Sequence, residues 1–334
     1  MNNKMWLLVN RPLAEPKVSD FKFVEKPLPP LRDGEILVRN HYLSLDPYMR
    51  MRMMETKSYA PPQPLNEVMI GGTVGEVIES KSDQFKVGDS VAALTGWQLF
   101  SVIDTSKQVI IRKVDVSRLG MSTYMGLVGL VGVTAWTGLK QIIEPKPGET
   151  IVVSAAAGAV GSIACQLAKR QGCRVIGIAG GAEKCSYVEN ELGIEYCVDY
   201  KAVENLDVAL AEVCPDGIDG YFDNVGGDAL QAVMRSANDF ARVAVCGMIS
   251  IYNGEKRPIQ DPLLILTKRL RLQGFVVTDS MHLWPQAFAE LKSLAESGEL
   301  KFKESLAKGI ESAPEAFIGM LKGKNFGKQL VKLI

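Results

Sequence analysis

The stretch from residue 151 to residue 169 constrains the fold most. It reads as an apolar strand, a tight turn of small residues and a helix in immediate succession, and a second apolar strand follows at 174–179. Small turn residues let the backbone approach a pyrophosphate closely, and the N–H groups at the helix start hold the anion. Ala156 replaces the first glycine of the G-x-G-x-x-G pattern, before Gly158 and Gly161. The surrounding strand, helix and strand still favour a dinucleotide site over an ordinary glycine turn.

The composition is that of a globular protein with more than one domain. The chain has 334 residues, 47% of them apolar and 23% charged, and this length favours about two domains. Basic and acidic residues both number 38, and no basic run occurs, so we expect neither nucleic acid nor a membrane surface as a partner. No apolar stretch resembles a signal peptide or a membrane span. The six cysteines form no C-x-x-C pair and are expected as reduced core residues of a cytoplasmic protein.

The pattern of expected secondary structure changes near residue 124. Before it, alternating segments at 34–39 and 72–78 and a turn at 85–91 predict a distorted β-barrel. After it, expected strands at 150–153, 174–178, 196–198, 220–222, 241–245 and 270–275 alternate with expected helices at 162–171, 182–192, 205–213 and 228–236. This alternation predicts an α/β fold with a doubly wound parallel sheet. A long helix is expected at 283–296, and the strand-like tail at 325–332 is a candidate to return to the barrel.

The whole chain resembles the medium-chain dehydrogenase/reductase superfamily, and within it the zinc-free group of prostaglandin reductases, plant double-bond reductases and curcumin reductases. The segments that carry the resemblance are 44–50, 133–139, 155–161, 223–227, 246–250, 252–253 and 325–328. The resemblance implies a GroES-like catalytic domain at 1–120, completed by 305–334, and a Rossmann domain that binds NADP(H) at 121–304. It also implies a homodimer.

The residues available argue against a catalytic zinc. Such a site needs three side chains, usually cysteine and histidine, around an open position. No cysteine precedes Cys165, and His41 and His282 are the only histidines. Where zinc-dependent relatives carry ligands, this chain has residues 44–46 and 72–73, which contain neither residue type. We therefore predict that the protein uses no metal.

The end of the second strand of the nucleotide unit favours NADP over NAD. Enzymes that prefer NAD place a carboxylate there to hold the ribose hydroxyls, whereas this strand ends in Ala179 and two glycines. Lys184 follows within reach of a 2′-phosphate, and Tyr200 closes the next strand. The resemblance implies that these two residues hold that phosphate; taken singly, each is also explained as an ordinary surface residue.

The resemblance extends to other cofactor contacts. It assigns Asn224 to the ribose region, the loop 246–252 to the nicotinamide half, and Asn325 to a closing segment. The predicted cofactor residues are Thr134, Ala157, Gly158, Ala159, Val160, Gly161, Lys184, Tyr200, Asn224, Cys246, Gly247, Met248, Ile249, Ser250, Tyr252, Phe275, Val276, Val277 and Asn325.

Without a metal or a nucleophilic triad, the cofactor must carry the reaction. We expect hydride addition to the β-carbon of an α,β-unsaturated ketone or aldehyde, which builds an enolate that needs a hydrogen-bond donor. Tyr252 is the candidate donor, and a ribose hydroxyl of the cofactor is the alternative. Tyr48, Arg50 and Arg52 are candidate substrate contacts, although their alternation with methionines also fits an edge segment with one buried face.

Two other functions remain open. A quinone reductase also needs no zinc, and a non-catalytic NADP-binding protein would keep the same cofactor loop. Residues 46–50 and the Tyr252 loop favour the enone or alkenal reductase.

Overall fold

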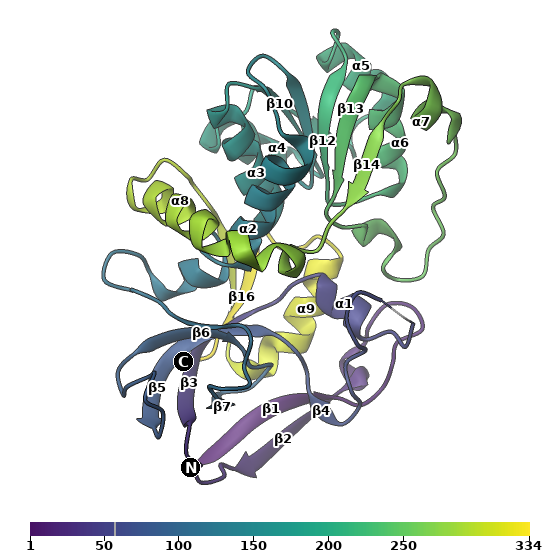
Figure 1. Ribbon diagram of the computed structural model, residues 1–334. Helices are drawn as coiled ribbons and strands as arrows, with labels where there is room; N and C mark the ends of the chain where they lie inside the picture. The colour runs from purple at the N-terminus through teal and green to yellow at the C-terminus, as the bar shows by residue number, and fades with distance from the viewer. Residues whose placement is uncertain (57) are drawn as a thin grey trace. The chain divides into compact units, whose positions relative to one another are not determined.

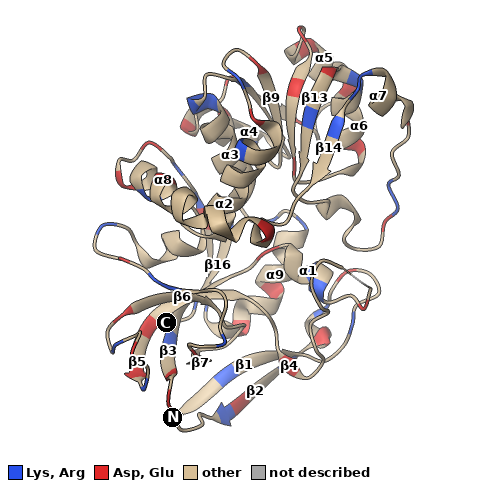
Figure 2. Cartoon of the chain, viewed as in Figure 1, with Lys and Arg blue, Asp and Glu red and all other residues tan. Residues whose placement is uncertain are grey.

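The computed structural model describes residues 1–56 and 58–334, which form two compact units. One unit comprises Met1–Gly126 and Glu304–Ile334, and the other comprises Leu127–Lys303. Lysine and arginine are interspersed with aspartate and glutamate among uncharged residues in the view of Figure 2. In the described part of the chain, no helix has the length and apolar character needed to cross a membrane.

The first unit is built on two sheets (Figure 1). The larger follows the order β15 (Glu304–Lys308), β16 (Lys328–Lys332), β3 (Glu35–Ser44), β5 (Gly72–Ser80), β6 (Ser90–Leu94) and β8 (Ile111–Lys113), with β7 (Phe100–Asp104) also paired to β3. The smaller joins β2 (Phe21–Pro27), β1 (Asn2–Leu8) and β4 (Glu67–Val68). Strand β16 pairs antiparallel with β3, so the expected return of the C-terminal tail to this unit is confirmed.

Two short α-helices and an aromatic core complete the first unit. The helices are α1 (Tyr48–Arg52) and α9 (Ala313–Leu321), with 3₁₀ turns at Val18–Asp20, Met121–Met125 and Ile310–Ser312. The rings of Phe21 and Trp97 stack with centroids 5.1 Å apart, and Phe317 meets Trp97 edge-on at 5.5 Å. Such large buried side chains each contribute about 1.5–3 kcal/mol of hydrophobic stabilisation.

The second unit is a doubly wound Rossmann fold, as predicted. Its parallel sheet has the order β11 (Tyr196–Asp199), β10 (Arg174–Ala179), β9 (Thr150–Ser154), β12 (Ile218–Asp223), β13 (Ala237–Val245) and β14 (Arg271–Gly274). The direction of winding reverses between β9 and β12. In open sheets of this kind, ligands bind outside the carboxyl ends of the strands at that reversal.

Helices connect and cover these strands (Figure 1). They are α2 (Leu130–Thr137), α3 (Ala159–Arg170), α4 (Ala182–Ser186), α5 (Leu206–Val213), α6 (Gly227–Ser236), α7 (Leu263–Thr267) and α8 (Trp284–Glu296), with π-helical turns at Gly138–Ile143 and Tyr187–Glu191 and 3₁₀ turns at Ile249–Ile251 and Val277–Leu283. Leu210 of α5 and Leu230 of α6 pack on Val152, Ile176 and Tyr221 of the sheet, and all five are buried.

Two expected elements differ from the observed ones. The expected helix at 182–192 is an α-helical turn followed by a π-helical turn. Strand β13 begins at Ala237, earlier than expected, because an irregularity in its pairing with β12 separates its first residue from the regular ladder. Phe240 lies within this irregular stretch with φ of 64° and an exposed ring, which hides the alternating pattern in the sequence.

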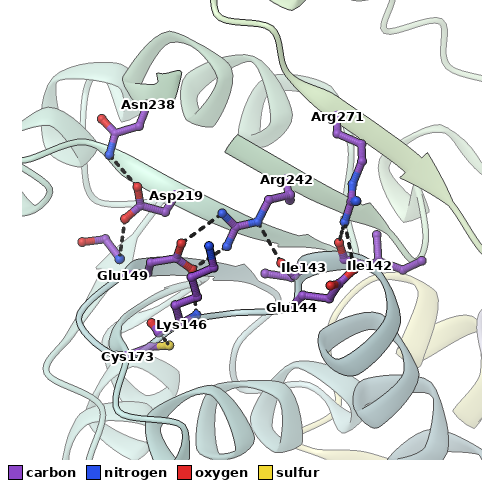
Figure 3. Close-up of polar contacts among 11 residues, drawn as sticks. Ile142, Ile143, Glu144, Lys146, Glu149, Cys173, Asp219, Asn238, Arg242 and Arg271 are labelled. Atoms are coloured by element: carbon purple, nitrogen blue, oxygen red, sulfur yellow. Dashed lines mark hydrogen bonds and ion pairs between the residues drawn. The ribbon is translucent and has the colours of Figure 1, made fainter. Parts of the chain in front are cut away.

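Polar contacts tie the amino ends of β9, β12 and β13 together (Figure 3). The Arg242 guanidinium pairs with both oxygens of the Glu149 carboxylate and donates through Nε to the Ile143 carbonyl at 2.8 Å. Asp219 accepts the Thr150 N–H at 2.9 Å and the Asn238 amide at 2.8 Å. These side chains bind other groups of the protein, so they stabilise the amino edge of the sheet. In open sheets of this kind, the ligand site is expected at the opposite, carboxyl edge.

Candidate cofactor and active site

The turn after β9 brings backbone unusually close to the start of α3. Ala155 has a left-handed φ of 48°, and its carbonyl accepts the Gly158 N–H at 2.8 Å. A side chain on Gly161 would overlap that same carbonyl oxygen, so only glycine permits this approach. Gly158 is the N-cap of α3 and no side chain caps the helix. The first turn of α3 therefore presents uncapped N–H groups of the kind that hold a phosphate.

The alanine that replaces the first glycine of the motif has a local explanation. Ala156 is fully buried, and its methyl would lie 2.9 Å from a Cβ added to Gly177 on β10. The methyl therefore fills space that Gly177 leaves empty. The departure of the sequence from the usual motif is compensated on the neighbouring strand.

Two lysines and a tyrosine meet beyond the carboxyl end of β10. The Tyr200 ring lies against Gly180, where an added Cβ would come within 2.7 Å of it. Burial lowers the pKa of Lys184, and the positive charge of Lys201 lowers it further. Lys201 also lies 6.0 Å from the centre of the Tyr200 ring. The structure thus places Lys201, a second cation, near both of the predicted residues, Lys184 and Tyr200.

A carboxylate does lie near this cluster, but the backbone occupies it. Asp199 accepts the N–H groups of Gly181 at 2.8 Å and Lys201 at 3.0 Å through one oxygen. Such bonds fix the turn after β11 and satisfy that oxygen within the protein. Glu183 also acts electrostatically on Lys184, so the cluster combines two lysines with two carboxylates. The Asp199 carboxylate is held by backbone N–H groups, and the two lysines are the groups that suit a phosphate.

Asp223 and Asn224 lie at the carboxyl end of β12, beside the end of β9. Asn224 donates its backbone N–H to Ser154 Oγ at 2.9 Å and its side-chain amide to the Ser154 carbonyl at 2.8 Å. Asp223 is fully buried, and its Oδ1 accepts the N–H groups of Val225 at 2.9 Å and Gly226 at 2.8 Å. Burial raises the pKa of this carboxyl, although its hydrogen bonds act in the opposite direction.

The predicted nicotinamide loop, residues 246–252, begins next to Asp223. The Asp223 carbonyl accepts the N–H groups of Cys246 at 2.8 Å and Gly247 at 3.1 Å. Burial and the neighbouring Asp223 raise the pKa of the Cys246 thiol to about 12. The Tyr252 hydroxyl oxygen accepts the Met248 N–H at 3.2 Å. The loop therefore folds back on itself and holds the tyrosine hydroxyl over its own backbone.

Aromatic packing supports the segment that follows β14. The Phe275 ring meets Phe222 edge-on at 6.3 Å, and a side chain on Gly138 would overlap both rings. Val276 and Val277 continue directly from this anchored ring. Thr134, on α2, donates its hydroxyl to the Leu130 carbonyl at 2.7 Å, so its oxygen is left as an acceptor.

The remaining predicted residues belong to the first unit. The Tyr48 hydroxyl is buried without a hydrogen-bond partner among the described residues, and burial and then Asp46 raise its pKa. The charge of Arg52 lowers the pKa of Tyr48 and also that of Tyr59, against the larger effect of burial. Tyr59 was not among the residues predicted from the sequence. The Asn325 amide donates to the Gly327 carbonyl at 2.8 Å.

Arg50 has a different environment from Tyr48 and Arg52. It is 1% exposed and donates to the Ala14 carbonyl at 2.8 Å. This contact assigns its guanidinium to holding the loop near Ala14 and gives no support to the prediction that Arg50 binds a substrate carboxylate.

The chain is similar to known oxidoreductases over nearly its whole length. Residues 4–111 match the family described as the N-terminal domain of oxidoreductase, and residues 159–293 match zinc-binding dehydrogenase. An NADPH-dependent curcumin reductase of Escherichia coli is 40% identical, covering 99% of this chain and 97% of that one. A 2-alkenal reductase (NADP(+)-dependent) of Nicotiana tabacum is 38% identical over 99% of this chain and 97% of its own. The chain belongs to the medium-chain dehydrogenase/reductase family.

A solved member of this family has nearly the same backbone. The structure of CurA from Vibrio vulnificus in complex with NADPH is 42% identical, covers 99% of both chains and has a TM-score of 0.93. Among the described residues, no group of three or more histidine, cysteine, aspartate or glutamate side chains is arranged to hold a metal ion. Metal independence stays a prediction for this family member.

Sequence reasoning missed Asp223, Ser154 and Lys201. Asp223 and Lys201 each follow or end a strand at the carboxyl edge, and that placement could have indicated them. Ser154 ends an otherwise apolar strand, where its hydroxyl reads as an ordinary turn residue. Its importance comes only from the pairing of β9 with β12, which sets it beside Asn224.

We expect the Gly161→Ala variant to be less stable than the wild type, although alanine is the better helix former by about 1 kcal/mol. The added methyl overlaps the Ala155 carbonyl oxygen, and overpacking of this kind costs about 1–3 kcal/mol. The midpoint of thermal unfolding measures the effect. The control is Gly319→Ala in α9, where the nearest atom to the added Cβ lies at 3.8 Å and stability should be kept or raised. Equal midpoints for both variants would contradict the close approach.

Proposed function

We propose that this protein is an NADPH-dependent reductase that transfers hydride to the carbon–carbon double bond of α,β-unsaturated ketones or aldehydes. The observation that carries the cofactor choice is the cluster of Lys184, Lys201 and Tyr200 beyond β10. Two cations suit a 2′-phosphate, which NADPH has and NADH lacks. The relatives named curcumin reductase and 2-alkenal reductase support the double bond as the reacting group, since an alkenal is an unsaturated aldehyde.

The residues of the second unit fit this cofactor along the carboxyl edge of the sheet. The proposal assigns the pyrophosphate to the turn 157–161, the ribose region to Asn224, and the nicotinamide half to residues 246–252 and 275–277. Gly161 provides the close backbone approach that a pyrophosphate needs. NADPH supplies the hydride when bound, and the protein's part is to orient the reactants and stabilise the charge that develops.

We assign the stabilisation of that charge to Tyr252. Hydride addition to the β-carbon moves negative charge onto the carbonyl oxygen of the substrate, where a hydrogen-bond donor stabilises it. The Tyr252 oxygen accepts the Met248 N–H, and an accepted hydrogen bond polarises the O–H group and strengthens it as a donor. Cys246 stays protonated in the same loop, and a protonated thiol is a poor nucleophile toward an unsaturated carbonyl.

The proposal extends to the substrate, the assembly and the compartment. Tyr48 and Arg52 remain the predicted substrate contacts, and Asn325 remains a predicted cofactor contact. We propose a homodimer, because β14 is an edge strand of the parallel sheet and a second copy can extend such an edge. A cytoplasmic location is supported by six free cysteines, which reducing compartments maintain.

The proposed function is tested by following NADPH oxidation in the presence of a panel of substrates. We expect turnover with 2-alkenals and enones and none, or much less, with saturated aldehydes, since these lack the reacting double bond. Faster turnover of quinones than of any enone would favour a quinone reductase. NADPH binding without oxidation in the presence of any of these compounds would make the protein a non-catalytic NADP-binding protein.

Lys184→Ala is expected to raise the KM for NADPH and leave that for NADH almost unchanged. A charge-assisted contact to phosphate contributes about 1.5–3 kcal/mol, which corresponds to one to two decades in binding. Steady-state kinetics with both cofactors measure the difference. Lys169→Ala is the matched control. Lys169 lies in the last turn of α3, away from the turn 157–161, and its replacement should leave both KM values unchanged. An equal loss with both cofactors would show that Lys184 does not distinguish the phosphate.

Tyr252→Phe is expected to lower kcat by roughly one to two decades while the Kd for NADPH stays close to that of the wild type. We expect a smaller loss than for a sole oxyanion donor, because a ribose hydroxyl of the bound cofactor would be a second donor to the same oxygen. Single-turnover kinetics and cofactor fluorescence measure the two quantities. Tyr196→Phe, on the exposed edge strand β11, serves as control. An unchanged kcat with a raised KM would make Tyr252 a wall of the pocket instead.

A further inference from the structure

Asp223 is the most heavily engaged side chain of the candidate site. Its Oδ1 accepts hydrogen bonds from the Tyr221 hydroxyl at 2.9 Å, the Val225 N–H at 2.9 Å, the Gly226 N–H at 2.8 Å and Ser154 Oγ at 3.3 Å. Its Oδ2 has no hydrogen-bond partner among the described residues, and the residue is 0% exposed. Burying a carboxylate costs free energy, which the bonds to Oδ1 offset only in part because Oδ2 has no partner among the described residues, so this side chain merits a structural or functional explanation.

Those bonds hold a loop that contains two consecutive glycines. Gly226 has φ of 70° and Gly227 has φ of 56°, both in the left-handed region. Glycine enters this region readily and leaves it as readily. The carboxylate selects one conformation by accepting two successive N–H groups, those of Val225 and Gly226.

Val225 transmits this constraint to the loop that carries Tyr252. Its carbonyl accepts the Ser250 N–H at 3.2 Å and the Ser250 hydroxyl at 2.7 Å. Ser250 is the middle residue of the 3₁₀ turn Ile249–Ile251, and Tyr252 follows directly. The start of the same loop is held by the Asp223 carbonyl through the N–H groups of Cys246 and Gly247. Both ends of the Tyr252 loop are therefore tied to Asp223, one through its backbone and one through its side chain.

We propose that Asp223 is a positioning residue for Tyr252, acting through Val225 and Ser250. The carboxylate fixes Val225, the Val225 carbonyl fixes the turn at Ser250, and the turn directs the tyrosine hydroxyl. This proposal rests on the proposed function, because it concerns the same hydroxyl that stabilises the enolate there.

Asp219 offers a matched control on the same strand. It lies near the opposite end of β12 and, like Asp223, accepts a backbone N–H and a side-chain donor. Figure 3 shows its contact with Asn238. Its other partner, Thr150, is the first residue of β9, at the amino edge of the sheet, whereas Val225 and Ser250 follow the carboxyl ends of β12 and β13. Asp219 is only partly buried, whereas Asp223 is fully buried. A purely structural role for the hydrogen-bonded aspartates of β12 would nevertheless predict no selective effect of Asp223 on the Tyr252 loop.

The test compares Asp223→Asn, Asp219→Asn and Ser250→Ala in the full chain, each with and without Tyr252→Phe. We expect Asp223→Asn to lower kcat about tenfold in the wild-type background, and to have little further effect when Tyr252→Phe is present, since both changes remove the same interaction. Ser250→Ala should show the same pattern more weakly, and it keeps the proposal testable if Asp223→Asn does not fold. Asp219→Asn should leave kcat unchanged.

Hydrogen–deuterium exchange provides a readout that does not depend on turnover. Asp223→Asn should accelerate exchange of the amides at 246–252, and Asp219→Asn should not. Equal losses of kcat from Asp223→Asn with and without Tyr252→Phe, or unchanged exchange in the loop, would overturn the positioning role. A wild-type protein that reduces no enone would overturn the proposed function instead, and the exchange data would still decide whether Asp223 holds the loop.

Discussion

The reversal of winding between β9 and β12 is the constraint on which the candidate site depends. Parallel strands end at a common edge, and at the reversal the connections leave in opposite directions, so the carboxyl ends of these two strands are not covered by a crossing helix. The turn 155–161, Asn224 and the loop after β13 all begin there. Because β9 and β12 pair directly, Ser154 and Asn224 meet at hydrogen-bond distance although 70 positions separate them in the chain.

Electrostatics differ along this edge in a way that suits a dinucleotide. Beyond β10, two lysines lie close enough for one to lower the pKa of the other, and the carboxylate of Asp199 is occupied by backbone N–H groups. Beyond β12 and β13, the ionisable groups are buried: Asp223 is enclosed by donors and the Cys246 thiol stays protonated. One end therefore offers two cations that suit an anion, while the other buries its ionisable groups and holds its backbone by directed hydrogen bonds, which suits hydride chemistry.

Steric fit at the glycines explains why the nucleotide turn tolerates an unusual residue. The helix start needs a glycine at 161 because the Ala155 carbonyl oxygen occupies the place of a side chain. The same turn accepts Ala156 because Gly177 on the adjacent strand leaves room for a methyl group. The change from glycine to alanine in the turn is thus accommodated by a glycine on the neighbouring strand. The sequence shows the alanine, but it does not show that Gly177 lies beside it.

Much of this protein was determined by local sequence. Apolar strands of regular spacing, the small residues of the turn and the absence of an acid after Ala179 depend on neighbours within a few positions, so they predicted the Rossmann fold and a preference for NADP. Tertiary structure alone decided the contacts of Arg50, Asp223 and Ser250. Arg50 turned toward the Ala14 carbonyl, a contact between segments 36 residues apart. Asp223 and Ser250 meet at Val225 because β12 and β13 lie side by side. Hydrogen bonds between distant segments depend on strand order and register, and these form only when the chain buries its core.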